Sequence, residues 1–91
     1  MHRETAYLRN PEAVVREESE NASLLFNPDT GDVLVINATG RFIWDLCAER
    51  NTMNDIIREF KENFDCLPAN LVEDIDSYMS IMTEGGFIGS Q

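Results

Sequence analysis

The sequence predicts an α+β domain in which a three-stranded antiparallel sheet precedes the helices. Apolar residues alternate with a period of two in the first half of the chain and recur with a period of 3.6 in the second half. Strands and helices that are separated in this way are typical of helices packed on one face of an antiparallel sheet. A chain of 91 residues has room for one core. We therefore expect one domain at residues 13–91, after an N-terminal arm at residues 1–12.

Three segments have strand character, and the turn between the last two is the clearest signal. The segments are Val14–Glu18, Ser23–Phe26 and Asp32–Ile36. The turn Asn27-Pro28-Asp29-Thr30-Gly31 has proline early and glycine late, which favours a tight reversal. The last segment, DVLVI, is rich in β-branched residues. The second and third segments are therefore predicted to form a hairpin.

The helical half begins directly after this hairpin. Asn37 is the predicted N-cap of a helix over about Ala38–Arg50. Thr52 is the predicted N-cap of a second helix, and Asp55 follows three residues later in a pattern like a capping box.

A third helix is predicted from Pro68, which suits a first turn, to about Glu84. Gly85-Gly86 is expected to end this helix, and Phe87-Ile88 to fold back onto its last turn.

The charge is strongly negative and unevenly placed. The formal net charge is −10, and no lysine or arginine follows Lys61. Such a surface repels phosphate backbones and anionic membranes and favours a basic partner, or it serves solubility alone. The chain has neither an apolar run as long as a membrane span nor a secretory signal, so we expect a cytoplasmic protein.

The sequence offers no group of residues suited to catalysis, metal binding or cofactor binding. The single histidine, His2, lies in the predicted arm, where it cannot be held against a nucleophile. Cys47 and Cys66 form no CxxC pair, and Asp29 and Asp32 lack the rest of a calcium loop. The acids of the third helix are interpreted as a solvated face. We therefore expect a protein that is not an enzyme and binds no cofactor.

The order of the elements is like that of a winged helix, which raises the question of DNA binding. The third helix would be the recognition helix that enters the DNA groove, yet it contains no lysine or arginine and has three acids near its start. DNA binding is therefore disfavoured. Trp44 is interpreted as a core residue rather than a half-exposed anchor.

One surface suggests a binding function. If the segment at residues 32–36 is an edge strand, its unpaired backbone groups can accept a peptide as an added strand. Alternate side chains of that peptide would then enter a trough between the strand and the third helix. The alternative is that the N-terminal arm covers the edge. The residues alone do not distinguish an edge that accepts a peptide from an edge that the arm covers.

Three stretches resemble a known family. They are GDVLVINATGRFIWDLC, NTMNDIIREF and LVEDIDSYMSIMTEGGFI, and the resemblance as a whole covers roughly Val14 to Ile88. In order and spacing they are similar to the PqqD family, the peptide-recognition modules of pathways that modify ribosomally made peptides.

The resemblance implies a winged-helix-like fold with three strands and three or four helices, and a peptide chaperone without catalysis. Such a module binds the leader of a precursor peptide as an added strand and presents it to a maturase, a radical-SAM enzyme in pyrroloquinoline quinone synthesis. By position, the guest strand would pair with Asp32, Val33, Leu34, Val35 and Ile36. Leu71, Ile75, Tyr78 and Met79 would form one wall, and Asp74 would meet a basic leader residue.

Two alternatives stay open beside this interpretation. One is a recognition element of another modified-peptide pathway, such as that of a lasso peptide. The other is a winged-helix regulatory domain that dimerises through its apolar surface. We expect a monomer or a weak homodimer.

Overall fold

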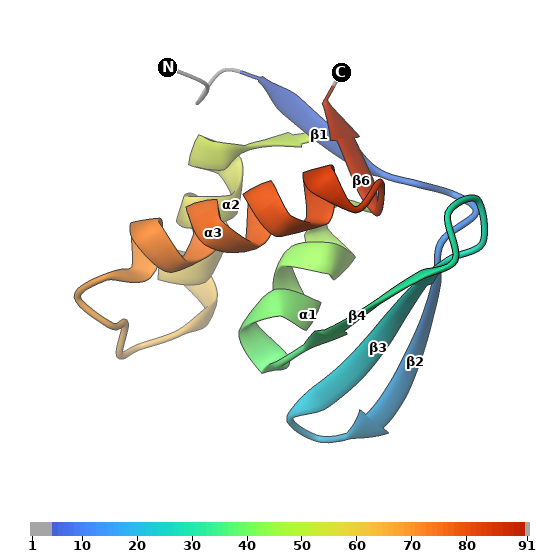
Figure 1. The fold of residues 1–91 in the computed structure, drawn as a ribbon. Coiled ribbons are helices and arrows are strands. Elements are labelled where there is room, and N and C mark those ends of the chain that lie inside the picture. Colours follow the sequence, from blue (N-terminus) through green and yellow to red (C-terminus); the bar gives the residue numbers. More distant parts are fainter. Residues whose placement is uncertain (1–4, 91) are drawn as a thin grey trace.

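A computed structural model of the chain describes residues 5–90 and has α+β architecture (Figure 1). The elements in chain order are β1 (Ala6–Arg9), β2 (Val14–Ser19), β3 (Ala22–Asn27), β4 (Asp32–Ile36), α1 (Ala38–Leu46), β5 (Asn51–Thr52), α2 (Met53–Asn63), α3 (Leu71–Glu84) and β6 (Ile88–Ser90). None of the helices in this described range is long and apolar enough to cross a membrane.

The strands form two small antiparallel sheets rather than one. The predicted three-stranded sheet is present, with the order β2-β3-β4. A second sheet, with the order β5-β1-β6, was not predicted. Its central strand β1 belongs to the predicted N-terminal arm, of which residues 1–4 lie outside the described part. In Figure 1 the two sheets lie on opposite sides of α3.

The predicted hairpin between β3 and β4 is confirmed. Its register pairs Asn27 with Asp32 and Leu25 with Leu34. Gly31 takes a φ of +81°, which glycine adopts without steric cost, and its N–H donates to the Asn27 carbonyl at 2.7 Å. Gly31 therefore allows the tight turn that joins the two strands.

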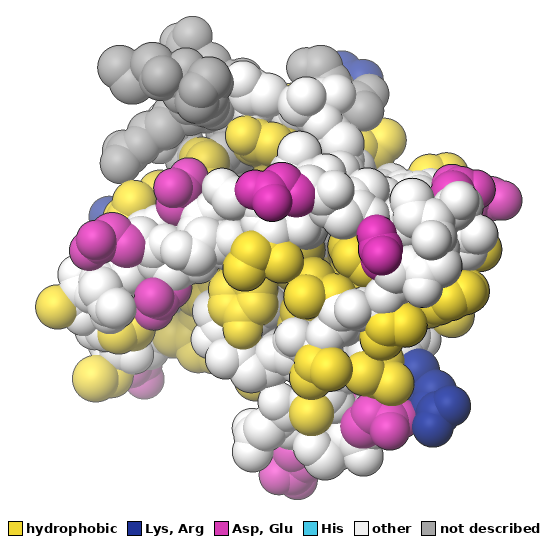
Figure 2. All heavy atoms as spheres, in the orientation of Figure 1, with side chains coloured by type: hydrophobic (Ala, Val, Ile, Leu, Met, Phe, Trp, Pro, Cys, Tyr) yellow, Lys and Arg dark blue, Asp and Glu magenta, His cyan; other side chains and the backbone are white. Residues whose placement is uncertain are grey.

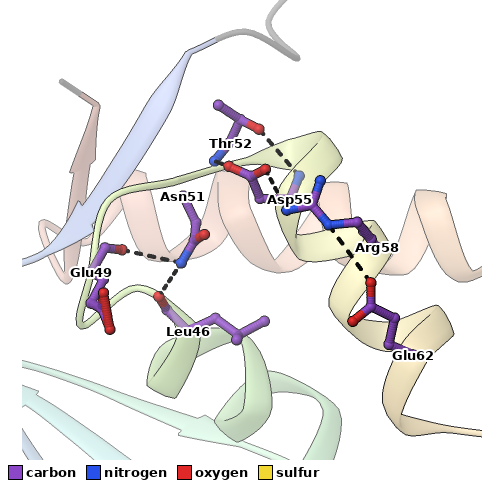
Figure 3. Close-up of polar contacts among 7 residues, drawn as sticks. All are labelled: Leu46, Glu49, Asn51, Thr52, Asp55, Arg58 and Glu62. Carbon is purple, nitrogen blue, oxygen red and sulfur yellow. Dashed lines mark hydrogen bonds and ion pairs between the residues drawn. The ribbon is translucent and has the colours of Figure 1, made fainter.

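The first helix has the predicted start but ends earlier than predicted. The Asn37 side chain accepts a hydrogen bond from the Gly40 N–H at 3.0 Å, as expected of an N-cap. The helix ends at Leu46 instead of near Arg50. The Asn51 side chain donates to the Leu46 carbonyl at 2.6 Å and to the Glu49 carbonyl at 3.3 Å (Figure 3). The Asn51 amide thus satisfies the carbonyl of the last helical residue, Leu46, which has no partner within the helix.

The capping box at the start of α2 is confirmed. The Asp55 N–H donates to the Thr52 hydroxyl at 3.1 Å, and the Thr52 N–H donates to the Asp55 carboxylate at 2.9 Å. Arg58 pairs with Asp55 at 2.9 Å and lies 3.9 Å from Glu62, so the contacts continue along the exposed side of the helix (Figure 3).

The C-terminal end of α3 is fixed by asparagines from both sides. Asn27 donates to the Gly85 carbonyl at 2.8 Å, and Asn10 donates to the Gly86 carbonyl at 3.1 Å. The Phe87 ring packs so closely on Gly85 that a Cβ there would lie 2.5 Å from it. The prediction that Gly85-Gly86 ends the helix and that Phe87 folds back is confirmed. The helix begins at Leu71, however, three residues after Pro68.

The core lies where the three helices meet the inner faces of the sheets. Its largest side chain is Trp44, which is 1% exposed, so the core interpretation of this residue is confirmed. The Arg9 guanidinium lies 5.3 Å from the Trp44 ring centre, within the range of a cation–π contact. Strand β1 thereby contributes to covering the core.

Replacing Asp55 with asparagine should lower stability at neutral pH, and this loss should shrink in acid. The hydrogen bond from the Thr52 N–H is the main cause that lowers the pKa of Asp55. A carboxyl whose pKa is lower in the folded state stabilises the fold fully above its unfolded pKa, about 3.9 for aspartate. That contribution disappears as the pH falls through the folded pKa. Urea unfolding of both proteins at neutral and at strongly acidic pH measures the difference.

The control for this experiment is Asp65→Asn, because Asp65 is exposed in the α2–α3 loop. An equal loss of stability for Asp55→Asn at both pH values would contradict the capping explanation.

Replacing Asn27 with alanine should destabilise the protein by roughly 1–3 kcal/mol, the cost of leaving a buried polar group without its partner. Asn27 is buried and also accepts a hydrogen bond from the Asp29 N–H at 3.0 Å. Urea unfolding measures the effect, with Asn21→Ala in the exposed β2–β3 turn as the control. Equal stability of the two variants would show that Asn27 does not hold the helix end.

Candidate functional site

Strand β4 is an edge strand with one unpaired side. It pairs with β3, and within residues 5–90 no strand pairs with its other side. The described part of the arm that was the alternative cover, residues 5–12, instead contains β1, which pairs with β5 and β6. The outward N–H and C=O groups of β4 are therefore a template for a further strand. Figure 1 shows β4 as the strand of its sheet nearest to α3.

The side chains of β4 are apolar on both faces of the sheet. Val33 and Val35 point to the outer face and are 59% and 64% exposed. The register places Phe26 beside Val33, and Val14 beside Phe26, so the exposed apolar surface extends across all three strands. Leu34 and Ile36 turn inward, where Leu34 is half-buried and Ile36 is buried. A strand added at this edge would meet apolar neighbours on both faces.

Helix α3 lies beside β4 and runs in the opposite direction (Figure 1), and we call the surface between the two elements the groove. One end of the helix is tied to the start of β4 through Asn27. Further along, Tyr78 packs against Gly40 close to Ile36, since a Cβ on Gly40 would lie 2.7 Å from the Tyr78 ring and 2.9 Å from Ile36. Gly40 thus lets α3 approach the end of β4 closely.

Helical spacing (i, i+4 and i+7) puts Asp74 and Ile81 on the same side of α3 as Tyr78, and we call these three residues the ridge. Asp74 and Tyr78 are half-buried, and Ile81 is 47% exposed. Figure 2 shows hydrophobic side chains gathered between α3 and the β2-β3-β4 sheet, with acidic side chains placed along the helix. The groove is therefore apolar with an acidic border.

Three of the four residues predicted to form the helix wall lie below this surface. Leu71, Ile75 and Met79 are buried in the core and expose little surface to a guest. Ile81 is not predicted from the sequence, because helical periodicity gives the apolar side of a helix but not which flank of that side borders the groove. The feature of the sequence that could have indicated Ile81 is its spacing from Asp74 and Tyr78 along the helix.

Two cavities border α3. One of about 200 Å³ lies at its N-terminal end, against the start of α1 and the α2–α3 loop. The other, of about 690 Å³, lies on the opposite flank between α3 and the β5-β1-β6 sheet. Val72 and Met79 line this second cavity, together with Glu73, Asp76 and Glu84. The flank of α3 beside the second cavity therefore carries more acidic residues than the flank beside the groove.

The two cysteines differ in burial and in reactivity. Burial raises the pKa of the Cys47 thiol to about 11, which keeps it protonated near neutral pH. Cys66 is exposed in the α2–α3 loop, and neither cysteine forms a disulfide. Within residues 5–90 no three histidine, cysteine or acidic side chains gather as metal ligands do.

The sequence model of the family described as Coenzyme PQQ synthesis protein D (PqqD) matches residues 23–88, from β3 to the start of β6. The chain belongs to the PqqD family. This membership supports, in general terms, a role in binding the precursor of a ribosomally made, modified peptide, as a non-catalytic accessory protein. No curated protein and no solved structure matches the chain significantly. The matched range of this PqqD-family chain includes β4 and α3, the two walls of the groove.

Replacing Gly40 with alanine should destabilise this PqqD-family protein by about 1–3 kcal/mol, the usual cost of overpacking. The new methyl group would overlap the Tyr78 ring and Ile36. Urea unfolding measures the loss, and a Gly40→Ala, Tyr78→Leu double variant should regain most of it. The control is Gly89→Ala, because no atom lies within 4 Å of a Cβ at that position. A Gly40→Ala protein as stable as this control would show that the contact is loose.

Proposed function

We propose that this protein binds the leader segment of a precursor peptide as a strand added to β4 and presents it to a maturase. The main support is the unpaired β4 edge, which has exposed apolar residues and lies beside the ridge Asp74, Tyr78 and Ile81 of α3. Edge strands are normally protected by charge, by bulges or by a covering element. An open, apolar edge next to a groove fits a surface that a guest strand completes.

The pathway that we propose is pyrroloquinoline quinone synthesis in the cytoplasm, with a radical-SAM enzyme as the maturase. Family membership supports this choice. A leader from another modified-peptide pathway would use the same surface. A winged-helix arrangement of the helices and the β3-β4 hairpin is part of the same proposal.

The groove favours a particular leader chemistry. The inward side chains of the guest strand would lie beside Leu34 and against Tyr78 and Ile81, while its outward side chains would lie beside Val33 and Val35. Apolar residues are therefore expected at successive positions of the paired segment. A lysine or arginine near Asp74 would be favoured by charge, because α3 carries acids and no basic residue.

Replacing Ile81 with glutamate should weaken leader binding by about tenfold, since burial of an apolar side chain contributes roughly 1.5–3 kcal/mol and Ile81 is half-exposed in the free protein. Val72→Glu is the matched control. Val72 is an exposed apolar residue of the same helix but borders the cavity on the opposite flank, so its replacement should leave affinity unchanged. Titration with overlapping synthetic peptides that tile the leaders of pyrroloquinoline quinone precursor peptides measures both variants.

Hydrogen exchange of the wild-type protein completes this test. Amides of β4 that point away from β3 exchange freely without peptide and should become protected when a leader peptide binds. Exchange rates in β4 that are unchanged with every leader peptide would contradict strand addition.

A second candidate function is a regulatory domain that dimerises through the outer face of the β2-β3-β4 sheet. The observation that favours it is the exposed row Val14, Phe26, Val33 and Val35. This candidate predicts a mass that rises with protein concentration and exchange rates that do not respond to peptides.

A further inference from the structure

The groove beside β4 leads into a small apolar cavity that strand addition alone does not use. The cavity has a volume of about 200 Å³. Its lining consists of Ala38, Thr39, Phe60, Phe64, Cys66, Leu67, Pro68, Leu71 and Asp74. Asp74 also begins the groove-facing ridge of α3, so the groove and the cavity share a wall.

The position of the cavity follows from the chain path at the end of β4. Ile36 is the last residue of the strand, Asn37 caps α1, and Ala38 and Thr39 are already part of the cavity wall. A strand advances about 3.3 Å per residue. A guest strand paired with β4 therefore reaches the cavity one or two residues beyond its paired segment.

The size and lining of the cavity fit one large apolar side chain. Sites for small-molecule ligands usually measure about 300–1,000 Å³, more than this cavity provides. Phe64 is 44% exposed although it stacks on Phe60, with ring centres 5.6 Å apart. Phe42 contacts the Phe64 ring edge to face at 5.2 Å and fixes its orientation. Part of the Phe64 ring therefore stays exposed beside the groove, in a fixed orientation.

We propose that this cavity is an anchor site for one large apolar side chain of the leader, such as leucine, isoleucine, methionine or phenylalanine, located just outside the added strand. The inference rests on the proposed function and adds a specificity site to it. The Asp74 carboxylate at the shared wall favours a lysine or arginine beside the anchor residue. If the guest runs antiparallel to β4, the anchor residue precedes the paired segment, and if it runs parallel, the anchor residue follows it.

Cys66 makes the cavity accessible to a direct test. It is exposed in the cavity lining, whereas Cys47 is buried and its pKa is raised to about 11. Iodoacetamide at about pH 8 should therefore alkylate Cys66 and leave Cys47 intact in the folded protein. The synthetic leader peptide that protects β4 from hydrogen exchange is the probe.

The anchor site predicts two results, which are protection of Cys66 from alkylation by the bound peptide and a loss of peptide affinity after alkylation. The bound peptide should slow alkylation of Cys66 by about tenfold or more at saturation, and alkylated protein should bind the peptide about tenfold more weakly, as for a lost apolar anchor. Alanine substitution of a single apolar peptide residue, outside the segment paired with β4, should abolish the protection of Cys66. The end of the peptide at which this residue lies gives the direction of the guest strand.

The matched control places the thiol on the other flank of α3. In a Cys66→Ser, Val72→Cys protein the peptide should not change the rate of alkylation, because Val72 borders the opposite cavity. A Phe64→Ala protein that unfolds at the same urea concentration as the wild type should bind the peptide as weakly as the alkylated protein does.

The outcomes separate this inference from the proposed function. Protection of β4 with unchanged alkylation of Cys66 and unchanged affinity after alkylation would overturn the anchor site and leave strand addition in place. A failure of every leader peptide to protect β4 would overturn strand addition and the anchor site together.

Discussion

The turn Gly85-Gly86 at the end of α3 is the constraint on which the rest of the structure depends. Its two carbonyls accept hydrogen bonds from Asn27 of the β3-β4 hairpin and from Asn10 of the β1–β2 connection. Gly86 takes a φ of +75°, a conformation that glycine adopts without steric cost. The Asn10 N–H also donates to the Phe87 carbonyl at 2.8 Å. One helix end therefore holds both sheets, although neither sheet pairs with the other.

This constraint explains why an open strand edge lies beside a helix at a fixed separation. The asparagine bonds hold α3 at the start of β4, and the close contact of Tyr78 with Gly40 holds it at the other end. Between these points the groove stays open, because Ile81 is exposed and the inward-facing Leu34 is only half-buried. An apolar edge of this kind favours aggregation unless another strand covers it. A module whose task is to receive a strand has a physical reason to keep such an edge.

The sequence predicts those parts of this arrangement that depend on neighbouring residues. The hairpin turn, the Asn37 cap, the Thr52–Asp55 capping box and the glycine stop of α3 are all set by contacts within a few positions. The β5-β1-β6 sheet escaped prediction because it consists of short strands brought together from Tyr7, Asn51 and Ser90. Of the site, β4 was predicted as a possible edge, while the contribution of Ile81 depends on how α3 is rotated in the fold. The small cavity depends on the α2–α3 loop, whose path has no local sequence signal.

The candidate site has two parts, the backbone edge of β4 and the side chains around it. These two parts would contribute differently to how such a module distinguishes one leader from another. In the proposed complex, backbone pairing along β4 would supply affinity that depends little on the guest sequence, because every residue except proline offers the same N–H and C=O groups. Discrimination between leaders would then come from the few places where side chains of the guest and of this protein meet. The proposed places are the Tyr78–Ile81 wall, the Asp74 carboxylate and the cavity beside Phe64. Modules of one family that serve different pathways can keep the β4 edge unchanged, and they are expected to differ at these positions.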